Sequence, residues 1–104
     1  MNLEDQFRLL VGGYYGVLEM DEYDLKLYVL EDIEDYIRNF IRLNPIDDFD
    51  YKEEAKKIED IPLKRKLQDA LIVLNKMNGS IELVLLIKKR LKQIHEDEME
   101  GMYV

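Results

Sequence analysis

The sequence predicts an all-α protein, a compact bundle of four to five helices that ends in an antiparallel helical hairpin over residues 61–77 and 80–97. Apolar residues recur at three- and four-residue spacing along most of the chain, which is the period of an amphipathic helix. Short stretches rich in Asn, Pro, Asp and Gly separate these segments, and such residues end helices. With 104 residues and 47% hydrophobic content, the chain is expected to form one folded domain.

Residues 3–18 carry the first helical stripe, which Gly12, Gly13 and Gly16 interrupt. Each glycine inside a helix costs about 1 kcal/mol relative to alanine. These glycines therefore either end the helix or allow another backbone to approach closely. Gly12 and Gly16 lie four residues apart, on one side of a helix, which favours a packing role over ligand binding.

Residues 21–43 form the longest helical pattern, and Asn44-Pro45 ends it because the residue before a proline avoids the helical conformation. A second interpretation stays open here. Apolar and polar residues alternate between positions 23 and 29, so residues 14–29 could instead form a short β-hairpin.

The second half of the chain predicts one short helix and then the hairpin. The short helix covers residues 51–59, with Asp50 as its N-cap, and Ser80 stands where the last helix needs a cap. The turn Asn78-Gly79 is so short that the two hairpin helices must run antiparallel. We expect a single helical domain over residues 1–97 and a frayed acidic tail over 98–104.

Both hairpin helices carry apolar residues away from their main stripes, which indicates burial on more than one side. A second copy of the chain would cover the surplus, so we expect a homodimer. Two adjacent tyrosines near the glycines are further candidate anchors, because tyrosine offers a large rigid surface with a polar tip. The predicted partner interface comprises Tyr14, Tyr15, Ile72, Val73, Ile81 and Leu85.

Charge is strongly sorted along the chain. Residues 1–51 hold 13 acidic and 4 basic residues, residues 52–95 hold 6 acidic and 11 basic ones, and residues 96–104 hold four acids and no base. Either the two halves attract each other inside the fold, or one of them faces a charged partner. We expect the basic hairpin to pack against the acidic helix 21–43.

Two basic clusters offer an alternative function, contact with nucleic acid. Against it stand the net charge of −8 and the lack of any aromatic residue between 52 and 102 on which bases could stack. The candidate contacts are Lys64, Arg65, Lys66, Lys88, Lys89 and Lys92.

Four carboxylates within about one helical turn form a candidate acidic patch, namely Glu31, Asp32, Glu34 and Asp35. The plain interpretation is a solubilising face. A second is a partner-binding patch, which in an acidic protein of this size extends to mimicry of a nucleic acid.

The sequence predicts no enzyme, metal, cofactor or small-molecule substrate. There is no cysteine, and the single histidine, His95, lies about 22 Å along one predicted helix from the single serine, Ser80. The acids at 47–50 miss the calcium-loop pattern, because Lys52 and Glu53 stand where an oxygen ligand and a glycine are required.

The function that these observations favour is a small non-enzymatic protein–protein interaction module, an adaptor, assembly factor or inhibitor, in dimeric form. Its partner would be another protein or a second copy, and nucleic acid is the less favoured partner. The N-terminal residues lack the basic start of a secretory signal, and the apolar runs are far too short to span a bilayer. We therefore expect a cytoplasmic protein with no membrane partner.

Overall fold

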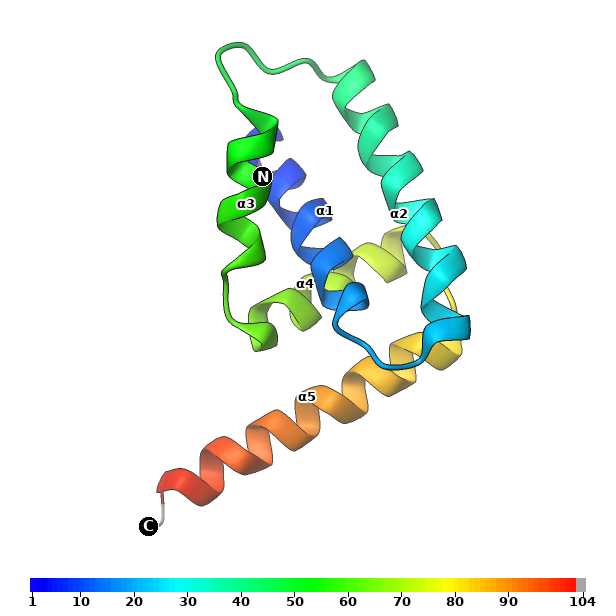
Figure 1. Ribbon diagram of the computed structural model, residues 1–104, viewed down its shortest axis with the longest axis vertical. Helices are drawn as coiled ribbons and strands as arrows, with labels where there is room; N and C mark the ends of the chain where they lie inside the picture. The colour runs from blue at the N-terminus through cyan, green and yellow to red at the C-terminus, as the bar shows by residue number, and fades with distance from the viewer. Residues whose placement is uncertain (103–104) are drawn as a thin grey trace.

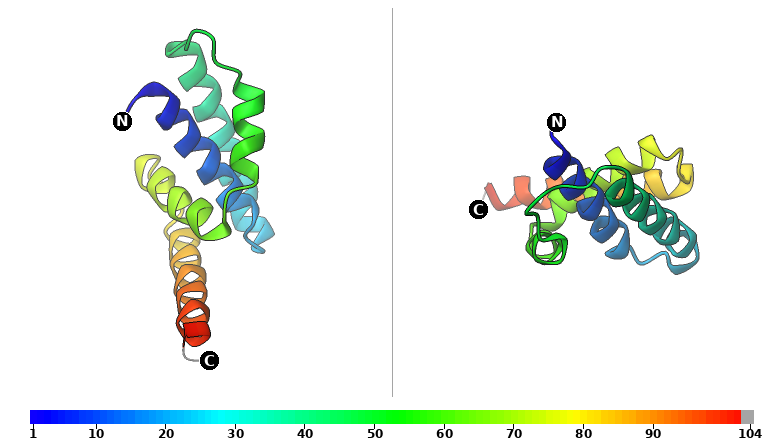
Figure 2. Two further views of the ribbon diagram at one scale, coloured as in Figure 1. Left: turned by 90° about the vertical axis from the view of Figure 1, so that its left-hand side faces the viewer. Right: turned by 90° about the horizontal axis from the view of Figure 1, so that it is seen from above.

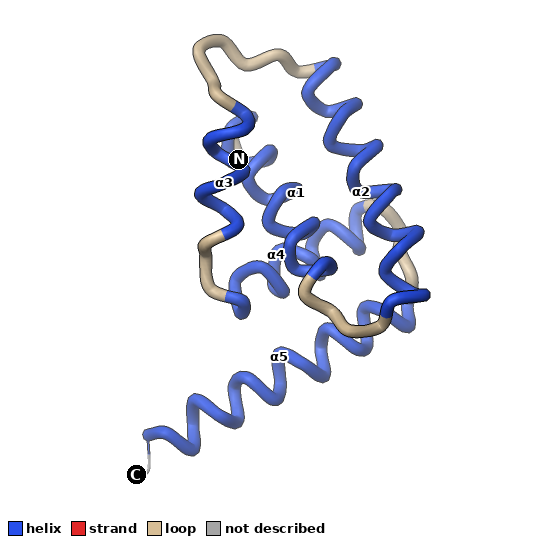
Figure 3. The backbone as a smooth tube through the Cα atoms, viewed as in Figure 1, coloured by secondary structure: helices blue, strands red, loops and turns tan. Residues whose placement is uncertain are grey.

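A computed structural model of the chain describes residues 1–102 and confirms the all-α prediction. Its helices are α1 (Leu3–Leu18), α2 (Tyr23–Leu43), α3 (Tyr51–Glu59), α4 (Leu63–Lys76) and α5 (Ile81–Met102). No strand occurs among the described residues (Figure 3). The β-hairpin considered for residues 14–29 is therefore wrong, since helices cover both sides of the turn at residues 19–22.

Helix α1 lies at the centre of the bundle and contacts α2, α3 and α4 (Figure 1). The hairpin thus packs chiefly on α1, and the expectation that it would pack on residues 21–43 is wrong. Among the described residues, the contact of helix α2 with the hairpin is small and involves α5. The α1 glycines contribute to this arrangement, because without side chains at Gly13 and Gly16 the α4 helix can approach α1 closely.

Three glycines of α1 form this crossing, as the packing interpretation predicted. A Cβ atom added at Gly16 would lie 2.2 Å from the carbonyl oxygen of Lys66, and one at Gly13 would lie 2.6 Å from Val73 Cγ2. Both distances are shorter than real Cβ contacts allow. Hydrogen in place of a side chain is therefore what brings the two helix backbones together.

The predicted caps of α3 and α5 are present. The Asp50 side chain accepts a hydrogen bond from the Glu53 backbone N–H at 3.1 Å, and Ser80 Oγ accepts one from Leu83 N–H at 3.3 Å. Asn2 caps α1 in the same way through Asp5 N–H at 2.8 Å. Each cap satisfies a backbone donor that the first helical turn leaves free.

The hairpin of α4 and α5 is antiparallel, and α5 projects beyond the other helices (Figures 1 and 2). Lys64 at the start of α4 bonds to Glu98 near the end of α5, with Nζ and Oε2 3.0 Å apart. The predicted end of this helix at residue 97 is wrong, because the helix continues through Met102. Residues 98–102 are thus helical where we expected a frayed tail, and 103–104 lie outside the described residues.

The core sits between α1 and α4 and continues onto the first turns of α5. Its most deeply buried side chains come from every helix except α3, and they are Val17, Ile33, Leu67, Val73, Leu74, Leu83 and Ile87. Val73 was predicted to face a partner, yet it is fully buried because it packs against Gly13. Its neighbour Ile72 stays 45% exposed.

Candidate functional site

An apolar groove runs over α1 between α2 and α3, with a volume of about 390 Å³. Side chains of α1, α2 and α3 line it, and Figure 1 shows α1 lying between the other two helices. The apolar and aromatic lining residues are Phe7, Val11, Tyr14, Tyr15, Ile37, Ile41, Tyr51 and Ala55. Glu34, Arg38 and Lys52 add charge to the lining.

Tyr14 and Tyr15 thus lie in this groove. The sequence alone suggested only that they anchor a partner. Their rings meet edge to face with centroids 5.7 Å apart, and the Tyr14 hydroxyl donates a hydrogen bond to Glu34 Oε1 at 3.0 Å. Burial raises the pKa of both phenols, and the bond to Glu34 raises the pKa of Tyr14 further. Both rings are half-buried, so they are held in place while part of each surface stays accessible.

A second aromatic cluster stiffens the groove at the N-terminal end of α1. The ring of Phe7 packs edge to face on Phe49 and on Tyr51, with centroids 5.5 Å and 5.1 Å apart. Such pairs add about 0.5–1.5 kcal/mol beyond the burial of their area. No pattern in the sequence pointed to this cluster, because Phe49 and Tyr51 belong to the loop and the first turn after it.

The turn end of the hairpin exposes two more of the predicted partner residues, Ile81 and Leu85. Ile81 is 77% exposed and Leu85 is 59% exposed, and both line a hollow of about 360 Å³ between the end of α4 and the start of α5. These residues therefore belong to a separate surface from Tyr14 and Tyr15. The structure does not bring the six predicted interface residues into one site.

The first basic cluster, Lys64, Arg65 and Lys66, forms ion pairs within the fold. Lys64 pairs with Glu98, and Arg65 pairs with Asp69 at 3.4 Å. Lys66 is buried, with its ammonium 3.3 Å from Glu19 Oε1 and 3.0 Å from the carbonyl oxygen of Glu59. The proposed contact of Lys66 with nucleic acid is therefore wrong, because the ends of α1 and α3 enclose this side chain.

The second basic cluster, Lys88, Lys89 and Lys92, is exposed on α5. Lys88 lines the hollow at the hairpin turn, whereas Lys89 lines a different pocket of about 170 Å³ between α5 and the α1–α2 turn. The lysines therefore face two surfaces of the helix. Within residues 1–102, none of the three forms an ion pair.

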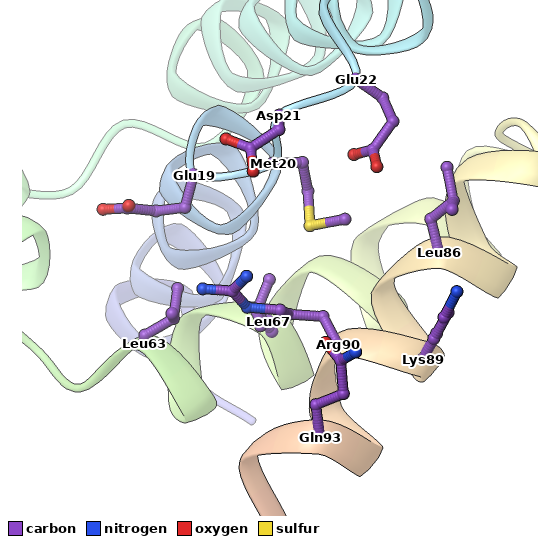
Figure 4. A pocket seen from close by; sticks show the side chains of 10 residues that line it. All are labelled: Glu19, Met20, Asp21, Glu22, Leu63, Leu67, Leu86, Lys89, Arg90 and Gln93. Atoms are coloured by element: carbon purple, nitrogen blue, oxygen red, sulfur yellow. The ribbon is translucent and has the colours of Figure 1, made fainter.

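The pocket beside Lys89 sets acids of the α1–α2 turn against bases of α5 (Figure 4). Asp21 and Glu22 lie on one side, Lys89 and Arg90 lie on the other, and the Met20 side chain points into the space between them. One oxygen of the Glu22 carboxylate, Oε2, is buried without a hydrogen-bond partner among the described residues. The opposite charges thus face one another here without forming direct ion pairs.

A further hollow of about 380 Å³ contains Asp69, Arg8 and Arg65. Burial raises the pKa of the Asp69 carboxyl, and the neighbouring Arg65 guanidinium partly opposes this shift. Arg8 bonds to Asp5 at 2.8 Å and to Glu54 at 3.0 Å. Because these charged groups already form ion pairs with their neighbours, the hollow has the character of a structural ion-pair network.

The structure divides the predicted acidic patch. Glu31, Asp32 and Asp35 are exposed on the outer side of α2, whereas Glu34 is half-buried and bonds to Tyr14 in the groove. Arg38 lies 3.2 Å from Asp35 and 3.6 Å from Glu34. In the part of the chain that the structure describes, no group of three His, Asp or Glu side chains is placed to hold a metal ion.

Comparison of the chain with known protein families, with curated proteins and with solved structures gave no match. Among the helices of residues 1–102, none has both the length and the apolar character needed to cross a bilayer. The interpretation of function therefore rests on the surfaces described above.

Proposed function

We propose that the protein is a small non-enzymatic interaction module that binds an amphipathic helix of a partner protein in the groove between α2 and α3. The observation that carries this proposal is the apolar lining in which Tyr14 and Tyr15 lie half-buried and fixed. Grooves of this kind receive the apolar face of a helix. Tyrosine is enriched at the energetic centres of interfaces because its ring is large and its hydroxyl tolerates partial burial.

The geometry of the groove supports this role in two ways. The edge-to-face aromatic packing and the Tyr14–Glu34 hydrogen bond fix the lining before a partner arrives, which reduces the entropy lost on binding. The charged groups Arg38 and Lys52 add polar contacts that would orient the bound helix.

Nucleic-acid binding is the competing proposal, and the exposed Lys88 and Lys92 favour it. Its weakness is the first basic cluster, whose three side chains are already paired in the fold. A binder of this kind would retain only the lysines of α5 and would lose affinity steeply with added salt.

The test is affinity capture from the native host, followed by the mass of the purified complex. The blocking variant is Ala55→Arg, which places a long side chain in the groove from a partly buried position of α3. The matched control is Gln68→Arg, which adds the same charge at an exposed position of α4 outside the groove.

We expect wild type and Gln68→Arg to retain one protein partner, and Ala55→Arg to bind the purified partner at least about tenfold more weakly, a loss of about 1.4 kcal/mol. Circular dichroism should show that all three proteins are equally folded. Equal retention of the partner by Ala55→Arg would refute the groove as the binding site. Recovery of nucleic acid instead of protein would favour the competing proposal.

A further inference from the structure

Few direct ion pairs of the described chain join its acidic segment to its basic segment. One ion pair, Lys66–Glu19, joins a base of residues 52–95 to an acid of residues 1–51 in the described chain. The remaining pairs lie within one of the sorted segments, join Lys64 to the C-terminal acids, or have the opposite polarity, as in Arg8–Glu54. Most of the sorted charges are therefore free of direct ion pairs within the described chain, and the exposed ones are available to a charged partner.

The outer face of α5 carries a basic and apolar strip of four residues, Ile81, Leu85, Lys88 and Lys92. Their spacing of four, three and four places them on one side of the helix. All four are exposed, and the two lysines have no ion-pair partner among residues 1–102. We name these residues the α5 strip.

The outer face of α2 carries a complementary strip with the same spacing, Tyr28, Asp32, Asp35 and Asn39. All four are exposed, and Tyr28 is 72% exposed. Asp35 contacts Arg38, but the pair is open to solvent and is worth at most about 1 kcal/mol, so Asp35 can exchange to another cation. We name these residues the α2 strip.

We propose that the protein forms a two-fold symmetric dimer in which the α5 strip of each copy packs on the α2 strip of the other. The two lysines would face the two aspartates, and Ile81 and Leu85 would find exposed apolar neighbours such as Tyr28 or Leu43. In a two-fold dimer the α5–α2 helix pair occurs twice. The buried surface area therefore approaches that of a specific interface, about 1,200–2,000 Å².

This dimer uses a different face from the groove, so the inference goes beyond the proposed function and stands or falls separately from it. The apolar ends of the strips supply area, and the charges select the partner face and orientation. Like charges brought together across such a contact cost several kcal/mol. Reversing the charges of one strip should therefore abolish the dimer. A chain with a reversed α5 strip and a chain with a reversed α2 strip should form a mixed dimer with each other.

The experiment uses light scattering on two double variants, Lys88→Glu/Lys92→Glu and Asp32→Lys/Asp35→Lys. Wild type should have the mass of two chains, and each variant alone should dissociate at least a hundredfold more readily and have the mass of one. An equimolar mixture of the variants should recover the mass of two chains, with both chains present in each particle. The control Lys56→Glu/Lys57→Glu makes the same charge change on α3, outside the groove, and should remain dimeric.

Three results would overturn the proposal. These are a monomeric wild type, variants that stay dimeric on their own, and a mixture that fails to associate although circular dichroism shows both chains folded. Association of wild type with added DNA through Lys88 and Lys92, in place of a second copy, would also overturn it. Capture of a protein partner through the groove, measured in parallel on the same variants, reports separately on the proposed function.

Discussion

The crossing of α1 and α4 and the outer faces of α2 and α5 use helix surfaces in opposite ways. At the crossing, glycines bring two backbones together, and Val73 and Ala70 are fully buried. On the outer faces, Ile81, Tyr28 and the charged residues between them remain exposed. The comparison indicates that the first region maintains the fold, and that the second is free to serve binding.

The two regions also differ in whether their charged side chains are paired. The buried ammonium of Lys66 is matched by Glu19 and by the Glu59 carbonyl, as a cation in the interior requires. Lys88 and Lys92 are exposed and have no such partner in the described chain. Substitutions should therefore reduce the free energy of unfolding in the first region and change association in the second.

The largest effect is expected at the closest contact of the crossing. Gly16→Ala would force α1 away from the Lys66 carbonyl, and backbone cannot yield as a flexible side chain does. We expect a loss of about 3 kcal/mol in the free energy of unfolding, measured by urea denaturation. Gly101→Ala is the control, because the added methyl group would meet no atom within 4 Å outside its own stretch of helix, and it should leave stability unchanged or slightly higher.

Neighbouring residues of α4 separate the two regions within one helix. Val73→Ala removes two methyl groups from a fully buried side chain and should cost about 2 kcal/mol. Ile72→Ala trims an exposed side chain and should change the free energy of unfolding by less than about 0.5 kcal/mol. Equal effects in thermal or urea unfolding would show that the boundary between core and surface has been misplaced.

Lys66→Met tests whether the paired ammonium of the first region is structural. The variant keeps the length of the side chain but leaves Glu19 and the Glu59 carbonyl without this donor, so we expect a loss of about 1 kcal/mol. The exposed Lys52 offers a comparison, and Lys52→Met should stay within about 0.5 kcal/mol of wild type. An unchanged midpoint for Lys66→Met would mean that the ammonium is dispensable.

The smallest effect concerns Asp69. Burial raises the pKa of its carboxyl in the folded chain. The folded state then holds the proton more tightly than the unfolded state does. The contribution of Asp69 to stability is therefore largest below the ordinary pKa of an aspartate and falls as the pH rises through the raised value. Asp69→Asn should remove this dependence and change stability at neutral pH by less than about 1 kcal/mol. A pH series of urea midpoints that fell equally in variant and wild type would contradict this.

Helix positions were predictable from the sequence, because amphipathic period and stop signals are local properties. The packing partner of the hairpin was not. Charge patterning favoured residues 21–43, whereas the close approach allowed by Gly13 and Gly16 selected α1. The strength of a glycine contact depends on the helix that meets it, and one sequence does not show which helix that is.

The candidate surfaces were predictable only in part. Tyr14, Tyr15, Ile81 and Leu85 were chosen by residue type and helical position, and the structure leaves all four at least partly accessible. Val73 and Lys66 were misassigned because the angular width of a buried face follows from tertiary packing, which adds one or two positions to the stripe. The division of the tyrosines and the hairpin residues between two surfaces required the fold.

The most direct test of the central claim, that the sorted charges act between molecules, is the solution mass of the wild-type protein against NaCl concentration. Between about 0.01 M and about 1 M salt the Debye length falls from about 30 Å to about 3 Å. We expect the mass to fall from two chains towards one while circular dichroism stays constant. A mass of one chain throughout, with helicity lost as salt rises, would show instead that the charges hold the single chain together.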